Sequence, residues 1–224
     1  MKFKLIILLC ISCLILSGCA RTIDTQEEVL NLNLTVTLKE SPNLSNTIYI
    51  IAFSSLSNLL PSLSNPGEYF FFPGKVFNST ALANLNRDVN YYYQNYFNTW
   101  SKFIFISGST IELFDSGSLF LSSTTDNFSY NYSQNFEYIF STDTFSFSLV
   151  MDISKLGFET NDLTYVRIYT FDKSEFIESG LFQDISDNTE MIQFTQFNQK
   201  TITSIENIFL NPHADIVKWS YSIY

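Results

Sequence analysis

The sequence predicts an all-β protein, folded as an antiparallel β-sandwich of about ten strands with one or two short helical turns. The chain has 23 Phe and 13 Tyr against only 7 Gly and 5 Pro, and aromatic and β-branched residues favour strands. Several segments alternate apolar with polar residues, and short turn-forming segments separate them. Uneven strand lengths and a long irregular arm favour a sandwich over a closed barrel.

The first two strands are predicted at residues 30–39 and 47–53. In the first, five aliphatic side chains from Leu30 to Leu38 share one face and polar residues occupy the other, which is typical of a half-buried strand. The second is more apolar and therefore more buried. The break at residues 41–43 leads us to expect a hairpin with a longer loop.

The middle of the chain mixes strands with a helical turn. A short strand is predicted at 68–72 and a buried strand at 102–106, while short strands at 111–114 and 118–121 flank a turn at 115–117. Between them, Tyr92, Tyr96 and Trp100 are spaced by four residues, which favours one or two turns of helix.

The last hundred residues contain most of the remaining strands. Residues 128–132, 136–140 and 145–153 alternate, and 154–157 resemble one helical turn closing on Gly157. Residues 163–171 are apolar on both faces, which predicts a central strand. Residues 173–190 are interpreted as an irregular arm, 191–197 and 202–208 as short strands, and 218–224 as a strand paired in the sheet.

The N-terminus predicts a signal peptide. Lys2 and Lys4 precede twelve uncharged residues, 5–16, whereas a membrane-spanning helix needs about 20. Leu16-Ser17-Gly18-Cys19 resembles the lipobox of bacterial lipoproteins. That resemblance implies diacylglycerol on the Cys19 sulfur and cleavage before Cys19. We therefore expect a signal peptide at 1–18, a lipidated cysteine and tether at 19–29, and one β-sandwich domain at 30–224.

This N-terminus constrains chemistry and location. Cys10 and Cys13 would leave with the signal and lipid would consume Cys19, which excludes disulfides, thiolate catalysis and cysteine metal sites. Acyl chains would anchor the protein on a membrane of the cell envelope. Ala20-Arg21 lacks the aspartate that, by resemblance, retains many lipoproteins at the inner membrane, so the outer membrane or cell surface is favoured.

The charge balance excludes nucleic acid as a partner. Cleavage would leave 10 basic and 22 acidic residues, a net charge of −12, and nucleic-acid binding needs clustered Lys and Arg.

The aromatic run at 91–100 is the candidate ligand-binding segment. Exposed Tyr and Trp rings beside Asn and Gln can stack on sugars, so Tyr91, Tyr93 and Trp100 are the candidate contacts. Alternatively, the same rings pack on the sheet as core. Tyr91 and Tyr93 are expected to be exposed and Trp100 to be buried.

Two further groups of residues bear on metal binding and catalysis. Asp184, Asp187 and Glu190 could offer oxygen ligands to calcium. Their spacing is not that of an EF-hand loop, so a solvated acidic loop is favoured, and no cofactor is expected. The single histidine, His213, excludes a multi-histidine zinc site. No nucleophile motif or paired acids in a motif are present, so no catalytic residue is assigned.

Residues 144–172 resemble DOMON-like sandwich modules. They contain an alternating strand, Ser154-Lys155-Leu156-Gly157, and a strand ending in Thr170-Phe171-Asp172. The resemblance implies a sugar or haem ligand. Haem would need axial ligands such as His213 with Met151 or Met191, and haem is not expected.

Three functional hypotheses remain open. The first is a non-enzymatic lipoprotein that binds a glycan or a protein partner outside the cytoplasm. The second is a structural or assembly component of the envelope without a small ligand. The third is a hydrolase whose acids are not identifiable from the sequence.

Overall fold

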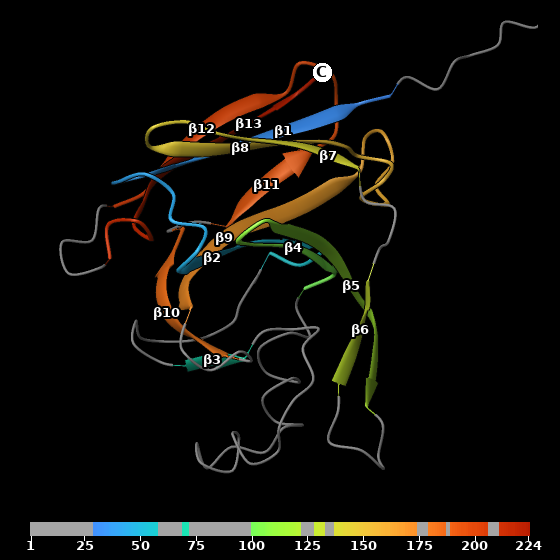
Figure 1. Cartoon of the computed structure of the whole chain (residues 1–224). Coiled ribbons are helices and arrows are strands. Elements are labelled where there is room, and N and C mark those ends of the chain that lie inside the picture. Colours follow the sequence, from blue (N-terminus) through green and yellow to red (C-terminus); the bar gives the residue numbers. More distant parts are fainter. Residues whose placement is uncertain are drawn as a thin grey trace, which may run out of the picture.

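The protein is a two-layer β-sandwich. The computed structural model describes residues 29–57, 69–71, 100–121, 128–132, 137–173, 179–186, 189–205 and 211–224. These residues form thirteen strands and no helix, and the strands make two antiparallel sheets that lie one above the other (Figure 1). The predicted all-β sandwich is therefore confirmed. No described segment is a helix long and apolar enough to cross a membrane.

The smaller sheet has five strands in the order β12-β13-β1-β8-β7 and forms the upper layer in Figure 1. Its strands are β1 (Asn31–Leu38), β7 (Tyr138–Thr142), β8 (Ser146–Asp152), β12 (Gln199–Thr203) and β13 (Ile216–Ile223). The strand predicted at the C-terminus is thus paired on both edges.

The larger sheet has eight strands. Seven follow the order β3-β10-β9-β2-β4-β5-β6, and β11 pairs with β9. The bounds are β2 (Thr47–Ser54), β3 (Tyr69–Phe71), β4 (Lys102–Ser107), β5 (Thr110–Leu121), β6 (Phe128–Tyr132), β9 (Leu163–Lys173), β10 (Ser179–Ile185) and β11 (Glu190–Gln193). β9 lies centrally, as its two apolar faces predicted.

The core fills the space between the sheets. Strand alternation places every second residue of β1, β8 and β13 inward, and these side chains are at most 5% exposed. They meet side chains from β2, β4 and β9 in one apolar cluster. One contact across the layers joins the rings of Tyr49 and Phe147, whose centroids are 4.9 Å apart.

The larger sheet also buries side chains on its far face. Every residue of β2 is buried, so both of its faces are covered. On the far face, the Trp100 ring lies 5.5 Å from Phe103 and 5.2 Å from Tyr169, measured between centroids, and Phe103 stacks on Phe114 at 4.9 Å. Trp100 is 3% exposed, so its expected burial is confirmed.

Two predicted connections are wrong. β1 pairs with β13 and β8, while β2 pairs with β9 and β4, so the two strands expected as a hairpin lie in different sheets. The strands expected at 111–114 and 118–121 are one strand, β5, because the predicted turn at 115–117 is a register shift opposite β6.

The predicted irregular arm at 173–190 is also wrong in part, because residues 179–185 form β10. Polar side chains there are buried and hydrogen-bonded instead of solvated. The Ser186 hydroxyl accepts a hydrogen bond from Ile168 N at 3.1 Å, and Asp184 is only 9% exposed. Pairing continues through a register shift between Phe182 and Asp184.

The turn predicted to close on Gly157 is confirmed as a single hydrogen-bonded turn. Phe158 N donates to Ile153 O at 3.0 Å and Gly157 N donates to Ser154 O at 2.9 Å. Gly157 has φ of 74°. This is the Schellman pattern, in which a left-handed residue ends a turn.

A buried polar clasp joins the two sheets where the chain enters β13. Asp184 Oδ2 accepts a hydrogen bond from Ile216 N at 2.8 Å, and Asp184 Oδ1 accepts one from Ile185 N at 2.8 Å. The Thr170 hydroxyl donates to Ala214 O at 2.7 Å, and the Tyr49 hydroxyl donates to His213 O at 2.8 Å. Side chains of the larger sheet thus hold residues 213–216 in place.

Candidate functional site

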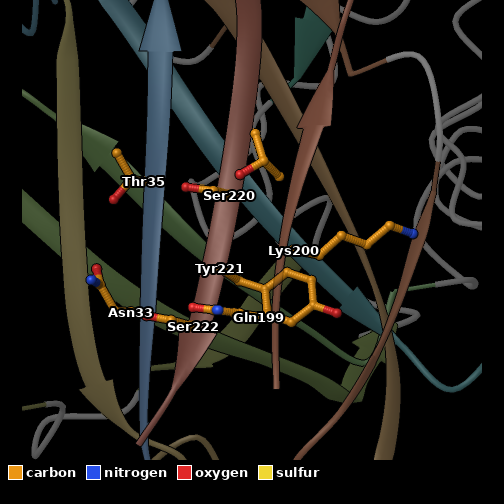
Figure 2. Close-up of a pocket in the computed structure, with 8 residues that line it drawn as sticks. Asn33, Thr35, Gln199, Lys200, Ser220, Tyr221 and Ser222 are labelled. Atoms are coloured by element: carbon orange, nitrogen blue, oxygen red, sulfur yellow. The ribbon is translucent and has the colours of Figure 1, made fainter. Parts of the chain in front are cut away.

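A depression of about 510 Å³ crosses β1, β13 and β12 of the five-stranded sheet. Figure 2 shows its lining, in a view in which the strands that carry Thr35 and Ser220 run from top to bottom. The lining residues are Asn33, Thr35, Gln199, Lys200, Thr201, Ser220, Tyr221 and Ser222. Most are short hydroxyl or amide side chains, and Lys200 is the one charged residue among them.

Strand alternation explains why this surface is polar. The inward positions of β1 and β13 carry aliphatic and aromatic residues, so the polar residues between them face outward. The pairing registers then bring one hydroxyl from each strand into a line across the sheet. This hydroxyl row consists of Thr201, Ser220, Thr35, Ser148 and Ser141.

Some hydroxyl groups of the hydroxyl row make no hydrogen bond to another described residue. Thr35 Oγ1 and Ser148 Oγ lie 2.8 Å apart and are hydrogen-bonded. For Thr201 and Ser220, the described residues offer no hydrogen-bond partner to the hydroxyl group. A ligand can therefore bond to these groups without first breaking a contact within the sheet.

Beside the hydroxyl row, Gln199, Ser222 and Asn33 pair directly across β12, β13 and β1. Asn33 Oδ1 is shielded from solvent and has no hydrogen-bond partner among the described residues. An unpaired buried acceptor costs about 1–3 kcal/mol.

An ion pair borders the depression and links the two layers. Lys200 Nζ on β12 lies 2.6 Å from Glu190 Oε1 on β11. The hydrogen bond to Glu190 raises the pKa of Lys200. Burial raises the pKa of Tyr221, and the negative charge of Glu190 adds to this effect. Lys200 is thus charged and compensated by the negative charge of Glu190.

The aromatic run contributes one described residue. Tyr91 and Tyr93 lie outside the described residues. Trp100 packs against Tyr169 and Phe103 on the far face of the larger sheet, and it does not line the depression.

The acidic candidates are engaged in other contacts. Asp184 binds backbone N–H groups, Glu190 binds Lys200, and Asp187 lies outside the described residues. Within the described ranges, no three His, Cys, Asp or Glu side chains gather in a way that could hold a metal ion.

The remaining candidates are spread over the fold. His213 Nδ1 lies 2.7 Å from Ser41 O, and Nε2 lies 3.6 Å from Glu40 Oε2. Met151 is 1% exposed in the core, whereas Met191 on β11 is 49% exposed. Cys19 lies outside the described residues.

The sequence pattern alone did not identify the depression. The polar half of residues 30–38 was visible as an alternation, but an alternating strand normally has a solvated face. The informative feature is the row across strands far apart in sequence, which depends on pairing registers.

Comparison with known proteins does not extend this description, since no protein-family model, curated protein or solved structure matches the chain.

Proposed function

We propose that this chain is a non-enzymatic lipoprotein of the cell envelope, anchored through Cys19, whose β-sandwich binds an uncharged glycan on the outer face of the five-stranded sheet. The observation that carries the glycan proposal is the hydroxyl row and the neighbouring amides of the depression. The observation that supports the anchor is Leu16-Ser17-Gly18-Cys19, directly after the apolar segment.

The lining matches what a sugar requires. Each sugar hydroxyl both donates and accepts hydrogen bonds, and Ser, Thr, Asn and Gln side chains do the same. Two of the row's hydroxyls have no internal partner among the described residues. The depression crosses three strands, which suits an extended chain, and the compensated Lys200 charge disfavours a strongly acidic ligand.

The proposed anchor limits how far the domain stands from the membrane. Residues 20–30 separate Cys19 from β1, and an extended chain spans at most about 3.3–3.6 Å per residue. The sandwich would therefore begin within about 40 Å of the lipid surface, close to envelope glycans.

The glycan proposal is tested with the full chain in detergent on an array of neutral and charged glycans. Thr201→Ala should weaken binding of any neutral hit about two- to tenfold, as expected for one lost hydrogen bond. Thr203→Ala is the matched control, because Thr203 lies two residues along the same face of β12 but outside the depression. It should leave affinity unchanged.

Absence of any glycan hit would refute this proposal, and equal effects of the two substitutions would refute the assigned face. Specific crosslinking to an envelope protein, without sugar binding, would favour the structural alternative.

The anchor is tested separately by metabolic labelling with a fatty-acid analogue. Cys19→Ser should abolish labelling, whereas Cys13→Ser should preserve it. Labelling that persists in the Cys19 variant would refute lipidation at this position.

A further inference from the structure

β7 ends the five-stranded sheet, and at residues 140–142 no described strand pairs with its outer edge. It pairs with β8 alone. Four of its five residues are exposed, and Ile139 is 69% exposed. The segment Tyr138–Thr142 contains no charged residue and no Pro, the residues that commonly protect edge strands from pairing with another chain.

The pairing pattern identifies the backbone groups at this edge. Asp143 N donates to Ser146 O at 2.8 Å, so Asp143 and Ser146 are a hydrogen-bonded pair. In an antiparallel ladder such pairs alternate with non-bonded ones. The next bonded pair is therefore Ser141 with Ser148, and the N–H and C=O groups of Phe140 and Thr142 point away from β8.

Contacts on the other side of β8 support this assignment. Leu38 N donates to Phe145 O at 2.8 Å, and Ile153 N donates to Leu30 O at 3.0 Å. These bonds direct the odd-numbered residues of β8 toward β1 and the even-numbered residues toward β7. Ser148 thus bonds to Ser141, which leaves Phe140 and Thr142 outward.

Acidic residues lie at both ends of the open edge. Glu137 precedes β7 and Asp143 follows it, and both are exposed. If two copies paired antiparallel through β7 about Phe140, Glu137 of each copy would face Asp143 of the other, and opposed like charges destabilise a strand pair. A strand from a different protein, with Lys or Arg at its ends, would instead form two favourable cross-strand pairs.

We propose that β7 is a docking edge at which an extended segment of another protein, with basic residues at both ends, adds to the five-stranded sheet as a sixth strand. Backbone hydrogen bonds to Phe140 and Thr142 provide the pairing. Glu137 and Asp143 select the basic ends, and Ile139 provides an apolar contact on the outer face. This edge is opposite β12 in the sheet order, and none of the residues that line the depression lies on β7.

The test measures binding of a fluorescent seven-residue peptide of alternating Thr and Val, with Lys at both ends, to the full chain in detergent. Thr142→Pro removes the outward N–H without removing a bond to β8, because proline is tolerated where an edge strand's N–H faces solvent. Thr142→Ala is the matched control, since alanine keeps the N–H.

We expect Thr142→Pro to weaken peptide binding about tenfold or more, as for loss of a hydrogen bond together with a steric clash, and Thr142→Ala to bind within about twofold of the parent chain. Glu137→Lys should weaken binding of the Lys-ended peptide and strengthen binding of a Glu-ended one. Binding should also weaken as salt is raised.

Equal binding of the Lys-ended and Glu-ended peptides would overturn the proposed selectivity, and equal binding by the proline and alanine variants would overturn the assignment to this edge. Analytical ultracentrifugation tests whether the parent chain self-associates through β7. Self-association of the parent chain that Thr142→Pro abolishes would identify a second copy as the occupant and refute the proposed partner.

Discussion

Removing the Asp184 carboxylate should destabilise the protein by separating its two sheets at the polar clasp. Asp184 lies on β10 of the larger sheet and accepts a hydrogen bond from Ile216 N at the start of β13 in the smaller one. Asp184 is 9% exposed and Ile216 is fully buried. In Asp184→Ala, the Ile216 N–H loses its acceptor in a place that water does not reach.

The magnitude follows from the number and type of bonds lost. Hydrogen bonds to charged groups contribute about 1.5–3 kcal/mol each, and the second bond, from the partly buried Ile185 N, is replaceable in part by water. We expect Asp184→Ala to lower the free energy of unfolding by about 2–4 kcal/mol. At about 2–4 °C per kcal/mol for a chain of this size, Tm should fall by roughly 4–16 °C.

Urea unfolding followed by tryptophan fluorescence measures this change, because Trp219 is 0% and Trp100 3% exposed in the folded protein. Asp184→Asn is the matched control. Its single carbonyl oxygen can serve Ile216 N but not Ile185 N as well, so the loss should be intermediate. Unfolding of the alanine variant within about 0.5 kcal/mol of the parent, the range of ordinary surface substitutions, would refute the structural role of this carboxylate.

Two further predictions concern backbone geometry and pH. Gly157→Ala should lower the free energy of unfolding by about 1–2 kcal/mol, because φ is 74° and alanine disfavours the left-handed region. Gly157→Asn should lower it less, since asparagine tolerates that region. Equal losses for the two variants in urea titrations would contradict this reasoning. Burial raises the pKa of Tyr49 to about 12 and also raises that of Tyr169, whereas an unfolded tyrosine titrates near 10. Their contribution to stability is therefore complete below about pH 10 and is lost as pH rises toward 12, at about 1.4 kcal/mol per pH unit for each ring. Tyr49→Phe should make the alkaline loss of stability less steep, and an unchanged pH profile would remove Tyr49 from this account.

Local patterns predicted most strands but not their partners. The alternation at residues 30–38 and the apolar run at 163–171 are properties of neighbouring residues, and both strands formed where expected. Pairing depends on residues distant in sequence. β1 pairs with β13 and β8 instead of β2, because residues 39–46 connect the five-stranded sheet to the eight-stranded one. No short-range signal distinguishes that connection from a hairpin.

Polar composition was misleading where side chains satisfy backbone groups. Residues 179–186 include Asp184 and Ser186, which in isolation predict a loop. In the folded chain their oxygens accept hydrogen bonds from Ile216, Ile185 and Ile168, so Asp184 and Ser186 are buried and residues 179–185 pair as a strand. The depression was missed for a related reason, since the hydroxyl row exists only after β1, β8 and β13 are in register.

The pairing of β1 with β13 also governs the order in which the sheets can form. Asn31 and Tyr224 exchange two backbone hydrogen bonds, at 2.8 and 3.2 Å, so the five-stranded sheet closes a loop that spans nearly all of the described chain. Long-range closure must be completed before its contacts stabilise the product, which slows folding. The ribosome would have to release β13 before β1 gained the second of its two neighbours. Until then, the edge of β1 that faces away from β8 would have no partner strand, and another extended segment could pair with it in place of β13.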